Sequence, residues 1–67
     1  MKTVHFRGGP LDGKKRRQER LSPMYRVHDP VGDKMRTTAY RLEYEKSANG
    51  RMVWVYVATA SAMRSLT

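Results

Sequence analysis

Apolar and polar residues alternate along most of this chain, and a period of two is typical of β-strands. Strands are expected over residues 2–7, 24–28, 36–46 and 51–58. In the first of these strands, Val4 and Phe6 share one face. The tail at residues 59–67 is expected either to form one helical turn, capped by Thr59 or Ser61, or to fray.

Clusters of Gly, Pro, Asn and Asp separate the strands and predict tight turns. Residues 8–13 include Pro10, which presets φ, and Gly13, which tolerates a positive φ. A second loop is expected over residues 29–33. Asn49-Gly50 is a strong hairpin signal, because a type I′ turn requires a positive φ at both of its central residues.

A two-residue turn at this position would set the register of the last hairpin, since the numbers of paired residues would then sum to 99. The three valines of strand 51–58 would face the core. Trp54 and Tyr56 would lie on the other face, directly across from Glu45 and Glu43. A slip of one residue would exchange the two faces.

Residues 14–21 are strongly basic, and their composition suits a helix as well as a strand. A helix here would have almost no apolar stripe to bury. Lysine-rich edge strands are common, because charge deters edge-to-edge pairing. We therefore expect an edge strand.

Together these elements predict an all-β fold, a small antiparallel sheet or open barrel of four to five strands with a C-terminal hairpin. Residues 1–58 are expected to form a single β domain, followed by the short tail. Trp54 is expected to be partly covered. The predicted core residues are Val4, Phe6, Leu11, Leu21, Tyr25, Val27, Tyr40, Leu42, Tyr44, Val53, Val55 and Val57.

Composition narrows the classes of function. The 67-residue chain has 14 Lys and Arg against 6 Asp and Glu, a formal net charge of +8, and no cysteine. These values exclude a multi-domain enzyme, a disulfide-stapled miniprotein and a thiolate metal site. So small a core leaves no room for a usual ligand pocket, and we expect no enzymatic activity, cofactor or small-molecule substrate.

No membrane-spanning segment is expected. The least charged stretch, residues 52–63, is much shorter than the roughly 20 apolar residues that a spanning helix needs. The N-terminal residues contain no apolar segment of the kind found in secretion signals. We therefore expect a soluble protein of the cytoplasm, or of a particle assembled there.

Two short patterns partly match known functional motifs, a phosphate-binding loop and a zinc site, but neither pattern is complete. The spacing of Gly8 and Gly13 matches the start of a P-loop, yet the Ser or Thr required after the P-loop lysine is Lys15 here. The two histidines, His5 and His28, lack the close ligand spacing of a structural zinc site. Neither a phosphate-binding loop nor a metal site is therefore expected.

Five cations within residues 14–20 form the first candidate site. Rows of cations at strand spacing suit a nucleic-acid backbone, since neutralised phosphates release condensed counterions. The alternative is a solvated edge that only prevents aggregation. The candidate nucleic-acid-binding residues are Lys14, Lys15, Arg16, Arg17 and Arg20, and Arg7, Arg26, Lys34, Arg36 and Arg51 would extend the patch.

A second candidate site is apolar. Met52, Trp54 and Tyr56 share one face and are candidate partner-binding residues. Such a face could stack nucleobases, but the expected register places carboxylates beside the rings, and carboxylates repel phosphates. The alternative function is therefore a protein-interaction module, bound through this patch or through an open strand edge.

The opening of the chain, a short strand followed by Arg7-Gly8-Gly9-Pro10-Leu11-Asp12-Gly13-Lys14, resembles the start of small uncharacterised proteins of actinobacteria and their bacteriophages. Late strands that alternate tyrosines, at residues 40–44 and 53–57, are loosely similar as well. The resemblance implies a bacterial or phage origin and a fold of β-strands, so the interaction module would be a virion component or a modulator of a host factor. It implies no catalytic residue. The cations of residues 14–17 make this chain more basic than that group.

Overall fold

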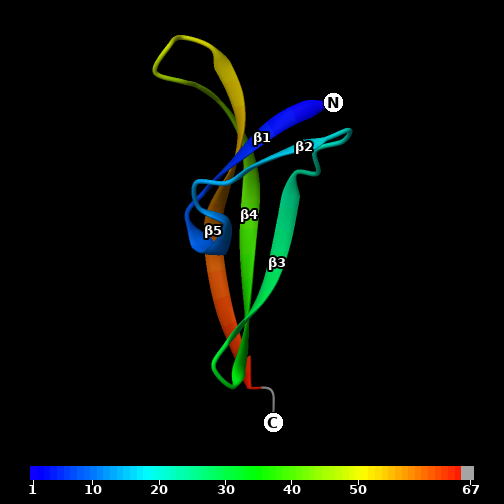
Figure 1. The fold of residues 1–67 in the computed structure, drawn as a ribbon, viewed down its shortest axis with the longest axis vertical. Helices are drawn as coiled ribbons and strands as arrows, with labels where there is room; N and C mark the ends of the chain where they lie inside the picture. Colours follow the sequence, from blue (N-terminus) through cyan, green and yellow to red (C-terminus); the bar gives the residue numbers. More distant parts are fainter. Residues whose placement is uncertain (66–67) are drawn as a thin grey trace.

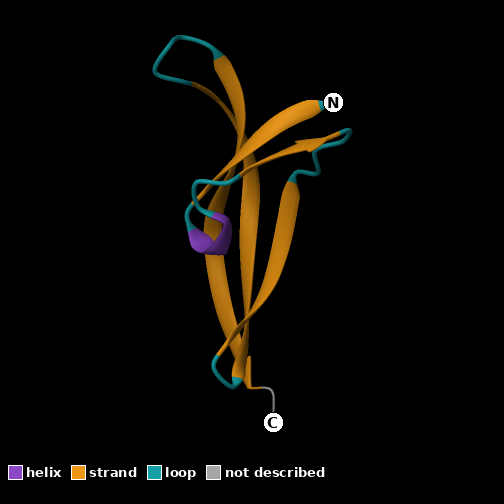
Figure 2. Cartoon of the chain, in the orientation of Figure 1, coloured by secondary structure: helices purple, strands orange, loops and turns teal. Residues whose placement is uncertain are grey.

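The computed structural model describes residues 1–65, and its strands form one five-stranded sheet that curls into a half-barrel (Figures 1 and 2). The all-β fold expected from the alternating pattern is confirmed. One turn of 3-10 helix, η1, spans Gly9–Leu11. The strands are β1 (Lys2–Arg7), β2 (Lys15–Gln18), β3 (Met24–Val31), β4 (Lys34–Lys46) and β5 (Met52–Ser65).

The strand order across the sheet is β2-β1-β5-β4-β3. Neighbouring strands are antiparallel except β1 and β5, which run parallel from Val4 beside Trp54 to Arg7 beside Val57. The expectation of an entirely antiparallel sheet is therefore wrong at this one contact. Parallel neighbours need a long crossover connection, and here β2, β3 and β4 together provide it.

β4 and β5, of 13 and 14 residues, give the molecule its longest dimension of 47 Å. Residues 59–65 extend β5 instead of forming the expected helical turn or frayed tail. Residues 60–65 pair with residues 34–39 of β4, so strand hydrogen bonding is available to them. Residues 66–67 of the expected tail lie outside the described part of the chain.

The loop expected over residues 29–33 is shorter than the sequence indicated. β3 continues through Val31, and Pro30 is tolerated there because β3 is an edge strand. Val31 pairs with Lys34, which leaves a two-residue turn. Its first residue, Gly32, has a φ of 63°, as the first central position of a type II′ turn requires.

The hairpin between β4 and β5 has a different turn from the type I′ turn expected at Asn49-Gly50. None of the described residues other than glycine has a positive φ, so Asn49 does not take the conformation that type I′ demands. Instead the Gly50 N–H donates to the Ser47 carbonyl (3.0 Å), and the Ser47 N–H donates to the Arg51 carbonyl (2.7 Å). Gly50 has a φ of 86°. The result is a three-residue loop, a type I turn followed by a left-handed glycine.

This longer loop shifts the pairing by one residue, so Tyr44 pairs with Trp54 and paired numbers sum to 98. The two faces of β5 are therefore exchanged relative to the expected register. Trp54 and Tyr56 turn to the concave, core-bearing side of the sheet. Glu43 and Glu45 lie on the convex side, across from valines. Between Ala39 and Tyr40 of β4, the pairing register shifts by one residue, because an extra residue in β5 forms a β-bulge there.

The core lies on the concave side, where Val4, Phe6, Tyr40 and Tyr56 are buried. The Phe6 ring packs edge-on against Tyr40 and stacks on Tyr56, with ring centroids 5.3 and 5.4 Å apart. Leu11, Leu21, Tyr25, Val27 and Leu42 pack against this cluster, as expected. Because the two faces of β5 are exchanged, Tyr56 joins the core, and Val53, Val55 and Val57 lie on the convex face, where only Val55 is buried. Tyr44 stays on the concave side as expected, but it is 53% exposed because it lies near the hairpin tip, beyond the buried cluster.

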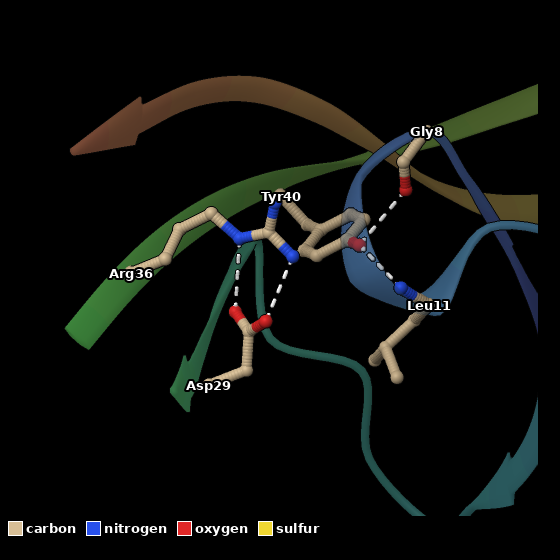
Figure 3. Close-up of polar contacts among 5 residues, drawn as sticks. All are labelled: Gly8, Leu11, Asp29, Arg36 and Tyr40. Atoms are coloured by element: carbon tan, nitrogen blue, oxygen red, sulfur yellow. Dashed lines mark hydrogen bonds and ion pairs between the residues drawn. The ribbon is translucent and has the colours of Figure 1, made fainter. Parts of the chain in front are cut away.

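Residues 8–13 form the expected turn, and the turn is fixed to the core through Tyr40 (Figure 3). The Tyr40 hydroxyl donates to the Gly8 carbonyl (2.8 Å) and accepts from the Leu11 N–H (3.1 Å). A Cβ atom on Gly9 would lie 2.5 Å from the same hydroxyl oxygen. Glycine is therefore required at position 9, both for this close approach and for its φ of 66°.

Candidate nucleic-acid interface

The structure brings the five candidate cations together along one edge of the sheet. β2 pairs only with β1 and forms the edge strand expected from its charge. Lys14 immediately precedes β2, and Arg20 follows it by two residues. All five residues, Lys14, Lys15, Arg16, Arg17 and Arg20, are exposed.

Ion pairs neutralise cations elsewhere but not at this edge. Within residues 1–65, the ion pairs are Arg7 with Glu45, Arg36 with Asp29, and Arg41 with Glu43, each with an N–O distance of 2.7 Å. None of them includes a residue of β2 or its flanks. Two of the cations expected to extend the basic patch, at positions 7 and 36, are therefore already paired.

Alternation along β2 sends Lys15 and Arg17 to the convex side of the sheet. Lys15 pairs with His5 of β1, and Arg17 pairs with Thr3. Lys15, Arg16, Arg17 and Thr3 line an open hollow of about 320 Å³. No carboxylate lines this hollow, so its electrostatic character is set by the charged groups of Lys15 and Arg17.

Arg16 differs from its neighbours because it points to the concave side. Its guanidinium lies over the Phe6 ring, 5.8 Å from the centroid, and donates to the Tyr25 hydroxyl (3.0 Å). Since β2 and β3 are the two ends of the sheet order, this hydrogen bond connects the two edges across the open side of the half-barrel. The main role of Arg16 is therefore structural, because it connects β2 with β3.

The apolar patch expected from Met52, Trp54 and Tyr56 does not exist as a single surface. Tyr56 is fully buried, and its hydroxyl donates to the Ser22 carbonyl (2.8 Å). Burial raises the pKa of the Tyr56 hydroxyl. Tyr56 therefore cannot contact a partner while the core is intact, and the register exchange is the reason. Met52 is 46% exposed, and Trp54 is partly covered, as expected.

A second hollow, of about 290 Å³, lies below η1 and is lined by Gly9, Arg36, Thr38 and residues 58–61. The Thr38 hydroxyl is buried and has no hydrogen-bond partner among the described residues. The Arg36 guanidinium donates twice to Asp29, at 2.7 and 3.1 Å, and these hydrogen bonds lower the pKa of the Asp29 carboxyl (Figure 3). Because Arg36 is paired, this hollow presents mainly small side chains and hydroxyls.

His5 and His28 are exposed, and His28 Nδ1 is hydrogen-bonded to the Thr37 hydroxyl at 2.8 Å. Across residues 1–65, no three His, Asp or Glu side chains gather in a way that could hold a metal ion. The same residues include no helix of the length and apolarity that crossing a bilayer requires.

The exposure of one aromatic residue, Tyr44, was not predicted from the sequence. Tyr44 was expected in the core, but it lies beside Trp54 on the concave side near the hairpin tip. The triplet Ala48-Asn49-Gly50 is the sequence signal that could have placed Trp54 beside Tyr44, because a three-residue loop ending in glycine is also common in hairpins.

Comparison of this chain with protein-family models, with curated protein sequences and with solved structures finds no match.

Proposed function

We propose that this chain is a non-enzymatic basic module that binds nucleic acid through the phosphate backbone, within a bacterial cytoplasm or a phage particle. The contacting side chains are those of Lys14, Lys15, Arg17 and Arg20, with Arg16 mainly holding the sheet edges together. One observation carries the proposal: exposed cations gather at an edge strand where, within residues 1–65, none of them is paired with a carboxylate.

Charge distribution supports a binding role over simple solubility. A surface that only keeps the protein soluble does best with both signs of charge interspersed. Here Glu43 and Glu45 are both paired with arginines that lie outside β2 and its flanks. The basic edge carries five cations and a single carboxylate, Glu19, and this excess of positive charge favours an anionic partner.

Salt dependence tests the proposal directly. Four phosphate contacts on duplex DNA predict a slope of about −3.6 in a plot of log affinity against log salt concentration. Between about 50 and 200 mM salt, this slope corresponds to a loss of roughly 150-fold in affinity. Fluorescence anisotropy with a labelled duplex measures the slope, and a flat salt response would contradict the proposal.

A matched pair of variants separates the patch from the overall charge. The test variant carries K14Q, K15Q, R17Q and R20Q. The control carries R26Q, K34Q, R51Q and R64Q, four other exposed cations that form no ion pair within the described residues. Both variants lose the same charge. We expect the test variant to lose most of the salt slope and the control to keep it; equal losses would show that only net charge matters.

The open edge of β5 favours a second candidate function, an interaction module that pairs with a second copy of itself. β1 pairs with β5 only over residues 54–57, so residues 59–64 have no strand neighbour on that side in the described structure. Their side chains include Ala60, Ser61 and Ala62, which are small and exposed. An unpaired edge of this kind can accept an added strand.

Sedimentation equilibrium of the whole protein tests this second candidate. If β5 pairs with a second copy, a dimer forms with rising concentration, and the double variant A60K/A62K abolishes it, because lysine deters edge pairing. A protein that stays monomeric at all concentrations would reject strand pairing between copies.

A further inference from the structure

The concave face carries an exposed aromatic pair near the hairpin tip. The Tyr44 and Trp54 rings lie with centroids 4.3 Å apart and planes at 33°. Tyr44 is 53% exposed, and its hydroxyl has no hydrogen-bond partner among residues 1–65. The Lys2 ammonium lies over the Trp54 ring, 5.7 Å from its centroid. The Tyr44 ring is thus held in place by Trp54, while much of its own surface stays exposed to solvent.

Strand pairing connects this aromatic pair to the basic edge. Tyr44 pairs with Trp54, and Trp54 lies beside Val4 of β1. Val4 pairs in turn with Arg16 of β2. Neighbouring strands are about 4.8 Å apart, so roughly 14 Å of sheet separate the aromatic ring from the basic strand. A single strand that contacts Tyr44 can span this distance to the sheet edge, where Lys15 and Arg17 project on the convex side.

The charges around the rings are positive. On β4, Lys46 lies two residues beyond Tyr44, and on β1, Lys2 lies two residues before Val4. Both lysines are therefore nearer the hairpin tip and on the same face as the two rings. Glu43 and Glu45 lie on the opposite face, where arginines neutralise them. The carboxylates that the expected register placed beside Trp54 are therefore absent from this surface, and the objection to base stacking no longer holds.

We infer that Tyr44, supported by Trp54 and flanked by Lys2 and Lys46, stacks a base of single-stranded nucleic acid whose backbone continues onto β2. The inference rests on the proposed function and adds the form of the nucleic acid. Bases in a duplex are already stacked on each other, whereas an unpaired base can lie on a side-chain ring. Every base has a flat π-face, so this contact selects single strands without selecting a sequence.

Anisotropy titrations of the whole protein test the inference with three probes of about 20 nucleotides: oligo(dT), oligo(U) and a DNA duplex. The variants are Tyr44→Leu, which removes the ring, and Tyr44→Phe, which keeps it. We expect Tyr44→Leu to weaken single-strand binding by about 5- to 150-fold, equivalent to roughly 1–3 kcal/mol for one stacked base, and to leave duplex binding unchanged. Tyr44→Phe should bind as the wild type does. Relative affinity for oligo(dT) and oligo(U) identifies DNA or RNA as the preferred strand.

Trp54 is the single tryptophan of the chain, so its fluorescence reports this site alone. Unlabelled oligo(dT) should change that fluorescence, while the duplex should not. The stacking inference is overturned if single strands and duplex bind with equal affinity, Tyr44→Leu has no effect and the Trp54 fluorescence does not change. In that case the proposal that the basic edge binds nucleic acid still stands. If neither nucleic acid binds in a salt-dependent way, the proposed function itself fails.

Discussion

Tyr40→Phe removes one oxygen atom and two hydrogen bonds, and it tests how the Gly-Gly-Pro turn is held to the sheet. The buried Tyr40 hydroxyl donates to the Gly8 carbonyl and accepts from the Leu11 N–H. Each such bond contributes a net of about 0.5–1.5 kcal/mol to stability. We therefore expect Tyr40→Phe to lower the free energy of unfolding by about 1–3 kcal/mol.

That loss is large for a domain of this size. At roughly 0.05–0.15 kcal/mol per residue, the whole chain is stabilised by only about 3–10 kcal/mol. Each kcal/mol lost shifts Tm by about 4–8 °C in domains of this length. Urea unfolding followed by circular dichroism measures the change, and amide exchange at Leu11 should speed up specifically because its acceptor is gone.

Tyr44→Phe is the matched control, since it deletes an exposed hydroxyl that makes no hydrogen bond within residues 1–65. Its stability should stay within about 0.5 kcal/mol of the wild type. If Tyr40→Phe also stayed within this range, with unchanged exchange at Leu11, the turn would not be anchored by Tyr40 and the reasoning would be refuted.

Three further substitutions probe the same region. Gly9→Ala should destabilise the fold by at least about 2 kcal/mol in urea unfolding, because a Cβ would meet the Tyr40 hydroxyl at 2.5 Å and alanine disfavours a φ of 66°. Thr38→Val should be neutral or stabilising by up to about 1 kcal/mol, since it replaces a buried hydroxyl that has no partner among the described residues; a clear loss of stability would mean that the hydroxyl is hydrogen-bonded after all. Asp29→Asn should remove a pH-dependent contribution. The pKa of Asp29 is lowered in the folded state by its hydrogen bonds with Arg36, so its contribution is present above the ordinary aspartate value and is lost as the pH falls through the lower folded value. Tm measured from acid to neutral pH should show the variant less stable at neutral pH and converging with the wild type in acid, and parallel curves would contradict this assignment.

The local features of the chain could be predicted from its residues because each rests on short-range physics. Alternation predicts four of the five strands, and the lysine-rich segment is expected at an edge because its charge is incompatible with the interior of a sheet. The turn at residues 8–13 follows from Pro10 and Gly13. The five candidate cations lie together because they are neighbours in the sequence.

Tertiary structure decided the register of the last hairpin, and with it the face on which every aromatic residue of β5 lies. Asn-Gly is compatible with a two-residue or a three-residue loop, and both kinds of loop are common in hairpins. The choice is made by burial across the sheet: in the observed register Tyr56 stacks on Phe6 and its hydroxyl reaches the Ser22 carbonyl. The parallel pairing of β1 with β5, which supplies Phe6, involves residues about 50 positions apart, and no local pattern encodes such a contact. The sequence alone therefore determined the approximate position of the strands, the turn at residues 8–13 and the basic edge. Long-range packing determined the hairpin register and which side chains of β5 are inside, and it placed Trp54 beside the exposed Tyr44.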